Sequence, residues 1–84
     1  MKIVFDAFAW EDYLYWQGHD REILKRINVL VRDIQREPNG GLGKPEWLRH
    51  DLAGYWSRRI NHEHRLVYRV EGDSLMFASC RYHY

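Results

Sequence analysis

The stretch at residues 65–82 reads RLVYRVEGDSLMFASCRY and decides the fold of this chain. Its two halves, residues 65–71 and 74–82, are rich in Val, Leu, Tyr and Phe, which favour β-strands. Gly72 and Asp73 separate the halves as a tight-turn pair, so the stretch is predicted to form an antiparallel hairpin.

The N-terminal half carries helical signals. Residues 2–5 predict a short strand, Asp6 an N-cap for a first helix, and Gly18 the end of that helix. Asp20 is predicted to cap a second helix, which Pro38 ends. The core-facing residues of the two helices are predicted to be Trp10, Tyr13, Ile23, Ile27, Leu30, Val31 and Ile34.

The order of these elements defines a fold class. Residues 39–45, NGGLGKP, read as a connector, and residues 55–60 predict a third strand just before the hairpin. The predicted order is β-α-α-β-β-β. This is an α+β fold in which a helical hairpin packs on one face of a mainly antiparallel four-stranded sheet.

Composition limits what the chain does. Its 84 residues hold 13 Lys or Arg against 12 Asp or Glu, and 45% are hydrophobic, which fits one domain spanning residues 1–84. The longest apolar runs are four residues, against the roughly 20 that a membrane-spanning helix needs. The single cysteine, Cys80, excludes an intramolecular disulfide, so we expect a cytoplasmic protein in which Cys80 is buried.

Positive charge is concentrated in residues 44–69, which hold six Lys or Arg against three Asp or Glu. Such a stretch is suited to a polyanionic partner. Arg58 and Arg69 are expected to lie on this basic strand face. The bases are Lys44, Arg49, Arg58, Arg59, Arg65 and Arg69.

The sequence does not support two common kinds of site, a phosphate-binding loop and a metal site. The run GGLGKP at residues 40–45 has Pro45 where a phosphate loop needs Ser or Thr. The five histidines and one cysteine show no recognised metal-ligand spacing. We therefore expect no metal and no cofactor.

Alternation along residues 65–71 separates two sets of side chains. Leu66, Tyr68 and Val70 are predicted to face the core. Arg65, Val67 and Arg69 then share the opposite face with Glu63, where Arg59 and His83 of neighbouring strands would converge. Together, Glu46, Arg65 and His83 provide a base, a cation and an acid, the minimum set for metal-free cleavage of RNA.

Three blocks of the sequence carry a resemblance to a known family. They are GKPEWLRHDLAGYWSRRINHEHRLVYRV at residues 43–70, CRYHY at 80–84 and DYLYWQ at 12–17. In these blocks the chain closely resembles the YoeB family of bacterial toxins, in the RelE/ParE superfamily. The resemblance implies the toxin of a type II toxin-antitoxin system, acting as a ribosome-dependent messenger-RNA endonuclease.

The resemblance also implies roles for individual residues. It makes Glu46 the general base, Arg65 the phosphate-stabilising cation and His83 the general acid. Arg49 stands where lysine is expected, so a planar fork replaces a point charge. The supporting and RNA-binding residues are Arg49, Arg59, Glu63 and Tyr84.

The implied partners are a YefM-type antitoxin and the ribosomal A site with its messenger RNA. Operator DNA would be bound only through the antitoxin, and a homodimer is left open. The antitoxin is expected to cover the basic strand face with an acidic, disordered segment that folds on binding. Two other functions stay open: a ParE-like gyrase-binding toxin, and a non-catalytic RNA-binding or co-repressor module.

Overall fold

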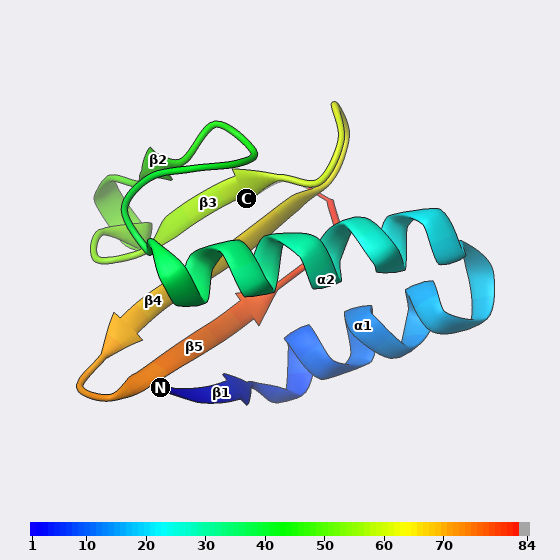
Figure 1. The fold of residues 1–84 in the computed structure, drawn as a ribbon, viewed down its shortest axis with the longest axis horizontal. Coiled ribbons are helices and arrows are strands. Elements are labelled where there is room, and N and C mark those ends of the chain that lie inside the picture. Colours follow the sequence, from blue (N-terminus) through cyan, green and yellow to red (C-terminus); the bar gives the residue numbers. More distant parts are fainter. Residues whose placement is uncertain (83–84) are drawn as a thin grey trace.

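The computed structural model describes residues 1–82 and confirms the α+β class. Two antiparallel helices lie side by side on one face of a sheet (Figure 1). The sheet has five strands in the order β1-β5-β4-β3-β2, with β1 parallel to β5 and the other neighbours antiparallel. The elements are β1 (Lys2–Phe5), α1 (Ala7–His19), α2 (Arg21–Arg36), β2 (Glu46–Trp47), β3 (Trp56–Arg59), β4 (Arg65–Glu71) and β5 (Ser74–Ser79).

The predicted sheet of four strands lacked β2. This strand has only two residues, too few for the alternation that reveals a strand in sequence. It exists because Glu46 and Trp47 pair with Ser57 and Trp56 of β3. The fifth strand therefore carries one of the predicted site residues, Glu46.

The helix boundaries follow from local capping. The Asp6 carboxylate accepts a hydrogen bond from the main chain of Ala9 at 2.9 Å, and Asp20 caps α2 in the same way. Gly18 was predicted to end α1 but lies inside it, and the helix continues to His19. Asp20 thus both ends α1 and begins α2, which makes the turn between the helices very short.

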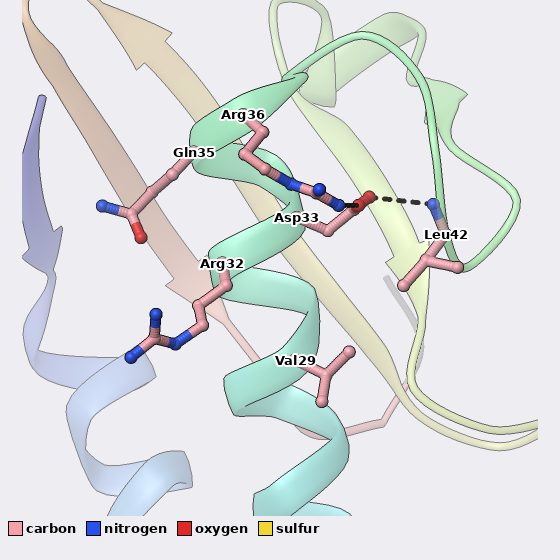
Figure 2. A pocket seen from close by; sticks show the side chains of 6 residues that line it. All are labelled: Val29, Arg32, Asp33, Gln35, Arg36 and Leu42. Carbon is pink, nitrogen blue, oxygen red and sulfur yellow. Dashed lines mark hydrogen bonds and ion pairs between the residues drawn. The ribbon is translucent and has the colours of Figure 1, made fainter.

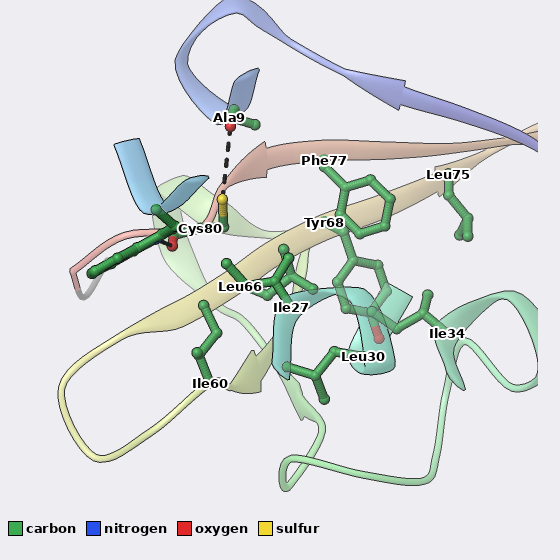
Figure 3. Close-up of a cluster of buried hydrophobic side chains, with 11 residues drawn as sticks. Ala9, Ile27, Leu30, Ile34, Ile60, Leu66, Tyr68, Leu75, Phe77 and Cys80 are labelled. Atoms are coloured by element: carbon green, nitrogen blue, oxygen red, sulfur yellow. Dashed lines mark hydrogen bonds between the residues drawn. The ribbon is translucent and has the colours of Figure 1, made fainter. Parts of the chain in front are cut away.

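The core lies between α2 and the central strands (Figure 3). It confirms the predicted apolar stripe of α2, of which Ile27, Leu30 and Ile34 are fully buried. Trp10, by contrast, is 48% exposed and packs on Phe5 at the edge of the sheet. The fully buried residues drawn around the stripe include Leu66, Tyr68, Leu75 and Cys80.

Burial along β4 follows the predicted alternation of buried and open faces only in part. Leu66 and Tyr68 are fully buried, but Val70 is 42% exposed because the hairpin end extends beyond the helices (Figure 1). Arg65 and Val67, expected on an open face, are buried as well. No helix among residues 1–82 is long and apolar enough to cross a lipid bilayer.

Candidate functional site

Strand register brings three of the predicted site residues to one face of the sheet. Arg59 of β3 lies directly opposite Arg65 of β4, and Glu46 lies opposite Ser57 of β3. Residues two apart on a strand share a face, so Glu46, Arg59 and Arg65 all point away from the helices. Glu46 lies two strands away from Arg65 and is offset from it by two residues along the strands, so their backbones are roughly 12 Å apart, a gap that two long side chains can span around a bound group.

The guanidinium of Arg65 is oriented by the loop before β4. Only 8% of Arg65 is exposed, and its Nη1 donates to the main-chain carbonyls of Asn61 and His64 at 2.8 and 3.1 Å. Its neighbour across the strands, Arg59, is exposed. Like charges directly opposite each other on a sheet are destabilising, so this pair of arginines favours an anion between them.

Glu63 lies beside His64 in this structure, with Oε1 3.6 Å from Nε2 of the imidazole. The resemblance makes Glu63 a supporting residue of the site, and the main-chain carbonyls that accept from Arg65 belong to its neighbours Asn61 and His64. Glu63 is exposed and lines a hollow of about 400 Å³ with Tyr15, Arg81 and Tyr82.

Residues 80–82 return to the start of β4, next to Arg65. The main-chain N–H of Arg65 donates to the carbonyl of Tyr82 at 3.0 Å. Tyr82 directly precedes His83 in the sequence. His83 and Tyr84, two of the predicted site residues, lie outside the described residues.

Glu46 and Arg49 line one hollow of about 440 Å³, together with Trp47 and His50. All three of Glu46, Trp47 and Arg49 are exposed; the first two form the edge strand β2, and Arg49 follows it. Glu46 and Arg49 therefore place a carboxylate and a guanidinium at the rim of a hollow that opens to solvent.

Arg58 corrects the predicted basic face, because its side chain is completely buried. All five of its N–H donors bind: Nε donates to the Tyr68 hydroxyl, and Nη1 and Nη2 to a carboxylate and three main-chain carbonyls. The carboxylate is that of Asp33, 2.8 Å from Nη1. Arg58 thus ties α2 and the following loop to β3 and is not available to a partner.

Asp33 is the anion that makes this burial tolerable. The main-chain N–H of Leu42, then the guanidinium groups of Arg58 and Arg36, lower its pKa to about 2. Figure 2 shows Asp33 pointing from α2 toward Leu42, on the wall of a hollow of about 550 Å³. This hollow shares no residue with the predicted site, and the Asp33 contacts show that its wall is structural.

Asn61 and His64 shape the site but were not predicted to belong to it. The Asn61 side-chain oxygen accepts from the main-chain N–H groups of Glu63 and His64 at 2.9 and 2.7 Å, and the main-chain carbonyl of Asn61 accepts from Arg65. The sequence signal for this loop is Asn61 itself, because Asn side chains often accept hydrogen bonds from main-chain N–H groups two or three residues later and so form tight turns. Within residues 1–82, no group of three or more His, Cys, Asp or Glu is placed to hold a metal ion.

Comparison with known proteins gives consistent matches. The family model described as "YoeB-like toxin of bacterial type II toxin-antitoxin system" matches residues 5–84. Toxin YoeB of Escherichia coli K12 is 57% identical over 84 residues, with both chains fully covered.

Two solved structures extend the likeness to the fold. The YoeB/ParE toxin from Agrobacterium tumefaciens is 51% identical, with a TM-score of 0.98 and both chains fully covered. The toxin in a heterotetrameric YoeB-YefM complex from Staphylococcus aureus is 50% identical, with a TM-score of 0.92. That likeness covers all of this chain and 98% of the other.

Proposed function

The chain belongs to the YoeB-like toxins of bacterial type II toxin-antitoxin systems, and from this premise we propose that it cleaves messenger RNA on the ribosome. The observation that carries the proposal is the pair Arg59 and Arg65, directly opposite each other on one face. Two guanidinium groups in this arrangement suit one phosphate, whose charge removes their mutual repulsion.

The proposed reaction uses the 2′-hydroxyl of RNA as nucleophile. Glu46 removes its proton, the oxygen attacks the adjacent phosphorus, and the bond to the 5′-oxygen breaks. His83 donates a proton to that leaving oxygen. The products are a 2′,3′-cyclic phosphate, or a 3′-phosphate after hydrolysis, and a 5′-hydroxyl.

Charge that grows on the phosphoryl oxygens would be held by Arg65 and Arg59. Because Arg65 is already oriented by two carbonyls, it needs little rearrangement when the phosphate arrives. Arg49 at the rim would contact a neighbouring phosphate, and Tyr84 would stack on an unpaired base. The ribosome would align the 2′-oxygen with the leaving group, which a small open site does poorly alone. The protein would therefore act in the cytoplasm.

The test is single-turnover cleavage of a translated messenger on purified ribosomes. We expect His83→Ala to slow cleavage ~10²- to 10⁴-fold, the usual contribution of a general acid. Arg65→Lys should also be slow, because one compact donor replaces a planar fork. Arg69→Lys is the matched control, since Arg69 is on the same strand but pairs with Glu71.

A messenger with a 2′-deoxy nucleotide at the cleaved position should resist cleavage. An intact messenger with wild-type protein would refute the proposal and favour a gyrase-binding toxin or an RNA-binding module. Cleavage by His83→Ala within threefold of wild type would remove His83 from the mechanism.

We further propose a YefM-type antitoxin as the partner, supported by the YoeB-YefM complex of the Staphylococcus relative. With Arg58 and Arg65 buried and Arg69 paired with Glu71, the exposed cations of residues 44–69 that are left for an acidic segment are Lys44, Arg49 and Arg59. Reversing the charge of Arg59 should weaken the complex more at low salt than at high salt. A salt-independent affinity would indicate an apolar interface instead.

A further inference from the structure

The main chain of residues 80–82 is fixed by groups that are distant in sequence. The N–H of Cys80 donates to the Asp12 carboxylate at 3.0 Å, and its carbonyl accepts from Nε1 of Trp16 at 2.8 Å. The N–H of Tyr82 donates to Nδ1 of His64 at 2.7 Å, and its carbonyl accepts from the N–H of Arg65. The chain is therefore held at both ends of this segment, up to the residue before His83.

Tyr82 has an unfavourable backbone conformation. Its φ is +63°, in the left-handed region that residues with a Cβ rarely occupy. Such strain persists only where surrounding contacts enforce it, and it concentrates at functional sites. Here the contacts that enforce it are the two hydrogen bonds to His64 and Arg65.

The bond to His64 dictates the state of that imidazole. A main-chain N–H only donates, so Nδ1 must carry no proton, and the neutral ring is protonated on Nε2. Nε2 faces Oε1 of Glu63 at 3.6 Å, which favours a proton at that position. The ring is 5% exposed and lies edge-on to Trp16, with 4.7 Å between centroids, so it has little freedom to turn.

We propose that His64 is a positioning residue for cleavage: its Nδ1 fixes the Tyr82 main chain and so sets where His83 acts. This rests on the proposed function, in which His83 is the general acid. The N–H and the carbonyl of Tyr82 are both held, and the carbonyl belongs to the peptide unit that leads to the next residue, so a shift of the Tyr82 main chain is passed along the covalent chain to His83. A misplacement of about 1 Å can lower a rate ~10²-fold.

Two substitutions separate this role from simple packing. In His64→Asn the side-chain oxygen occupies the place of Nδ1 and still accepts from Tyr82, whereas His64→Phe keeps a ring and loses the acceptor. We expect His64→Phe to reduce single-turnover cleavage ~10²-fold at unchanged affinity for the ribosome. His64→Asn should recover most of that loss. Both are compared at a temperature where unfolding measurements show them fully folded.

Nuclear magnetic resonance of the wild-type chain tests the contact without any variant. We expect the ¹⁵N spectrum to show His64 protonated at Nε2 only, and the Tyr82 amide to exchange slowly with solvent. A proton on Nδ1, or fast exchange at Tyr82, would overturn the proposal even if the variants fail to fold.

The cleavage rates of the variants also test the proposal. Equal rates for folded His64→Phe and wild type, or equal losses in the Phe and Asn variants, would refute the role of Nδ1. If the wild-type chain leaves the messenger intact, the proposed function itself fails. The magnetic-resonance result would then still report whether His64 holds Tyr82.

Discussion

Replacing Arg58 with Met should destabilise the fold severely, although Arg58 stands beside an exposed arginine in the sequence. The buried guanidinium makes five hydrogen bonds, and hydrogen bonds to a charged group contribute about 1.5–3 kcal/mol each. These contributions do not add up over the donors of one side chain, because the guanidinium is removed from water only once and its five partners act as a unit. The net loss on removing one partner of such a buried pair is about 3–5 kcal/mol.

That loss is large for a chain of 84 residues, whose total stability should be roughly 4–13 kcal/mol. Each kcal/mol lowers the melting temperature of a small domain by about 4–8 °C, so we expect a drop of at least about 12 °C. Methionine keeps most of the side-chain volume, so the change reports lost polar contacts more than a cavity.

The assay is equilibrium unfolding in urea, followed by far-ultraviolet circular dichroism. Arg59→Met is the matched control, because Arg59 is exposed on the same strand and its replacement should change stability by no more than about 0.5 kcal/mol. An Arg58→Met variant within 1 kcal/mol of wild type, at an unchanged slope against urea, would refute the reasoning. It would mean that the loop after α2 holds its place without the arginine.

Three further predictions concern stability and reactivity. A main-chain N–H and two guanidinium groups lower the pKa of Asp33 from 3.8 to about 2. Between these two pH values the unfolded chain therefore binds more protons at Asp33 than the folded chain does. Stability should therefore fall as pH decreases from about 5 toward 2, with a weaker dependence in Asp33→Asn, measured as urea midpoints; identical profiles would exclude Asp33 as the cause. Burial raises the pKa of the Cys80 thiol to about 12, so iodoacetamide at neutral pH should alkylate it only in denaturant, and rapid labelling of the folded chain would contradict its burial. Gly43→Ala should cost about 1–3 kcal/mol more than Gly54→Ala: both have positive φ, but only at Gly43 would a Cβ come within 3.0 Å of a main-chain oxygen, and equal losses would show that backbone strain alone matters.

Local signals in the sequence were sufficient for the helices, the hairpin and the family. The capping by Asp6 and Asp20 involves donors only two or three residues away, and the apolar stripe of α2 follows from helical periodicity. The strand β4 was predicted with its observed ends. These features depend on residues that are close in sequence, so they can be predicted from the sequence without knowledge of the fold.

Only the tertiary structure shows that Arg58 is buried while its neighbour Arg59 is exposed. Alternation places neighbours on opposite faces, but it does not say which face a loop will cover or where an anion such as Asp33 will stand. The pairing of Glu46 with β3 likewise depends on register, since a two-residue strand has no pattern of its own. The contact of His64 with Tyr82 spans 18 residues and is possible only because the chain end returns to the start of β4. The sequence by itself thus determined which residue types are present and which elements form. The long-range contacts, whose partners are brought together only by folding, decided which arginine stabilises the fold and which faces solvent.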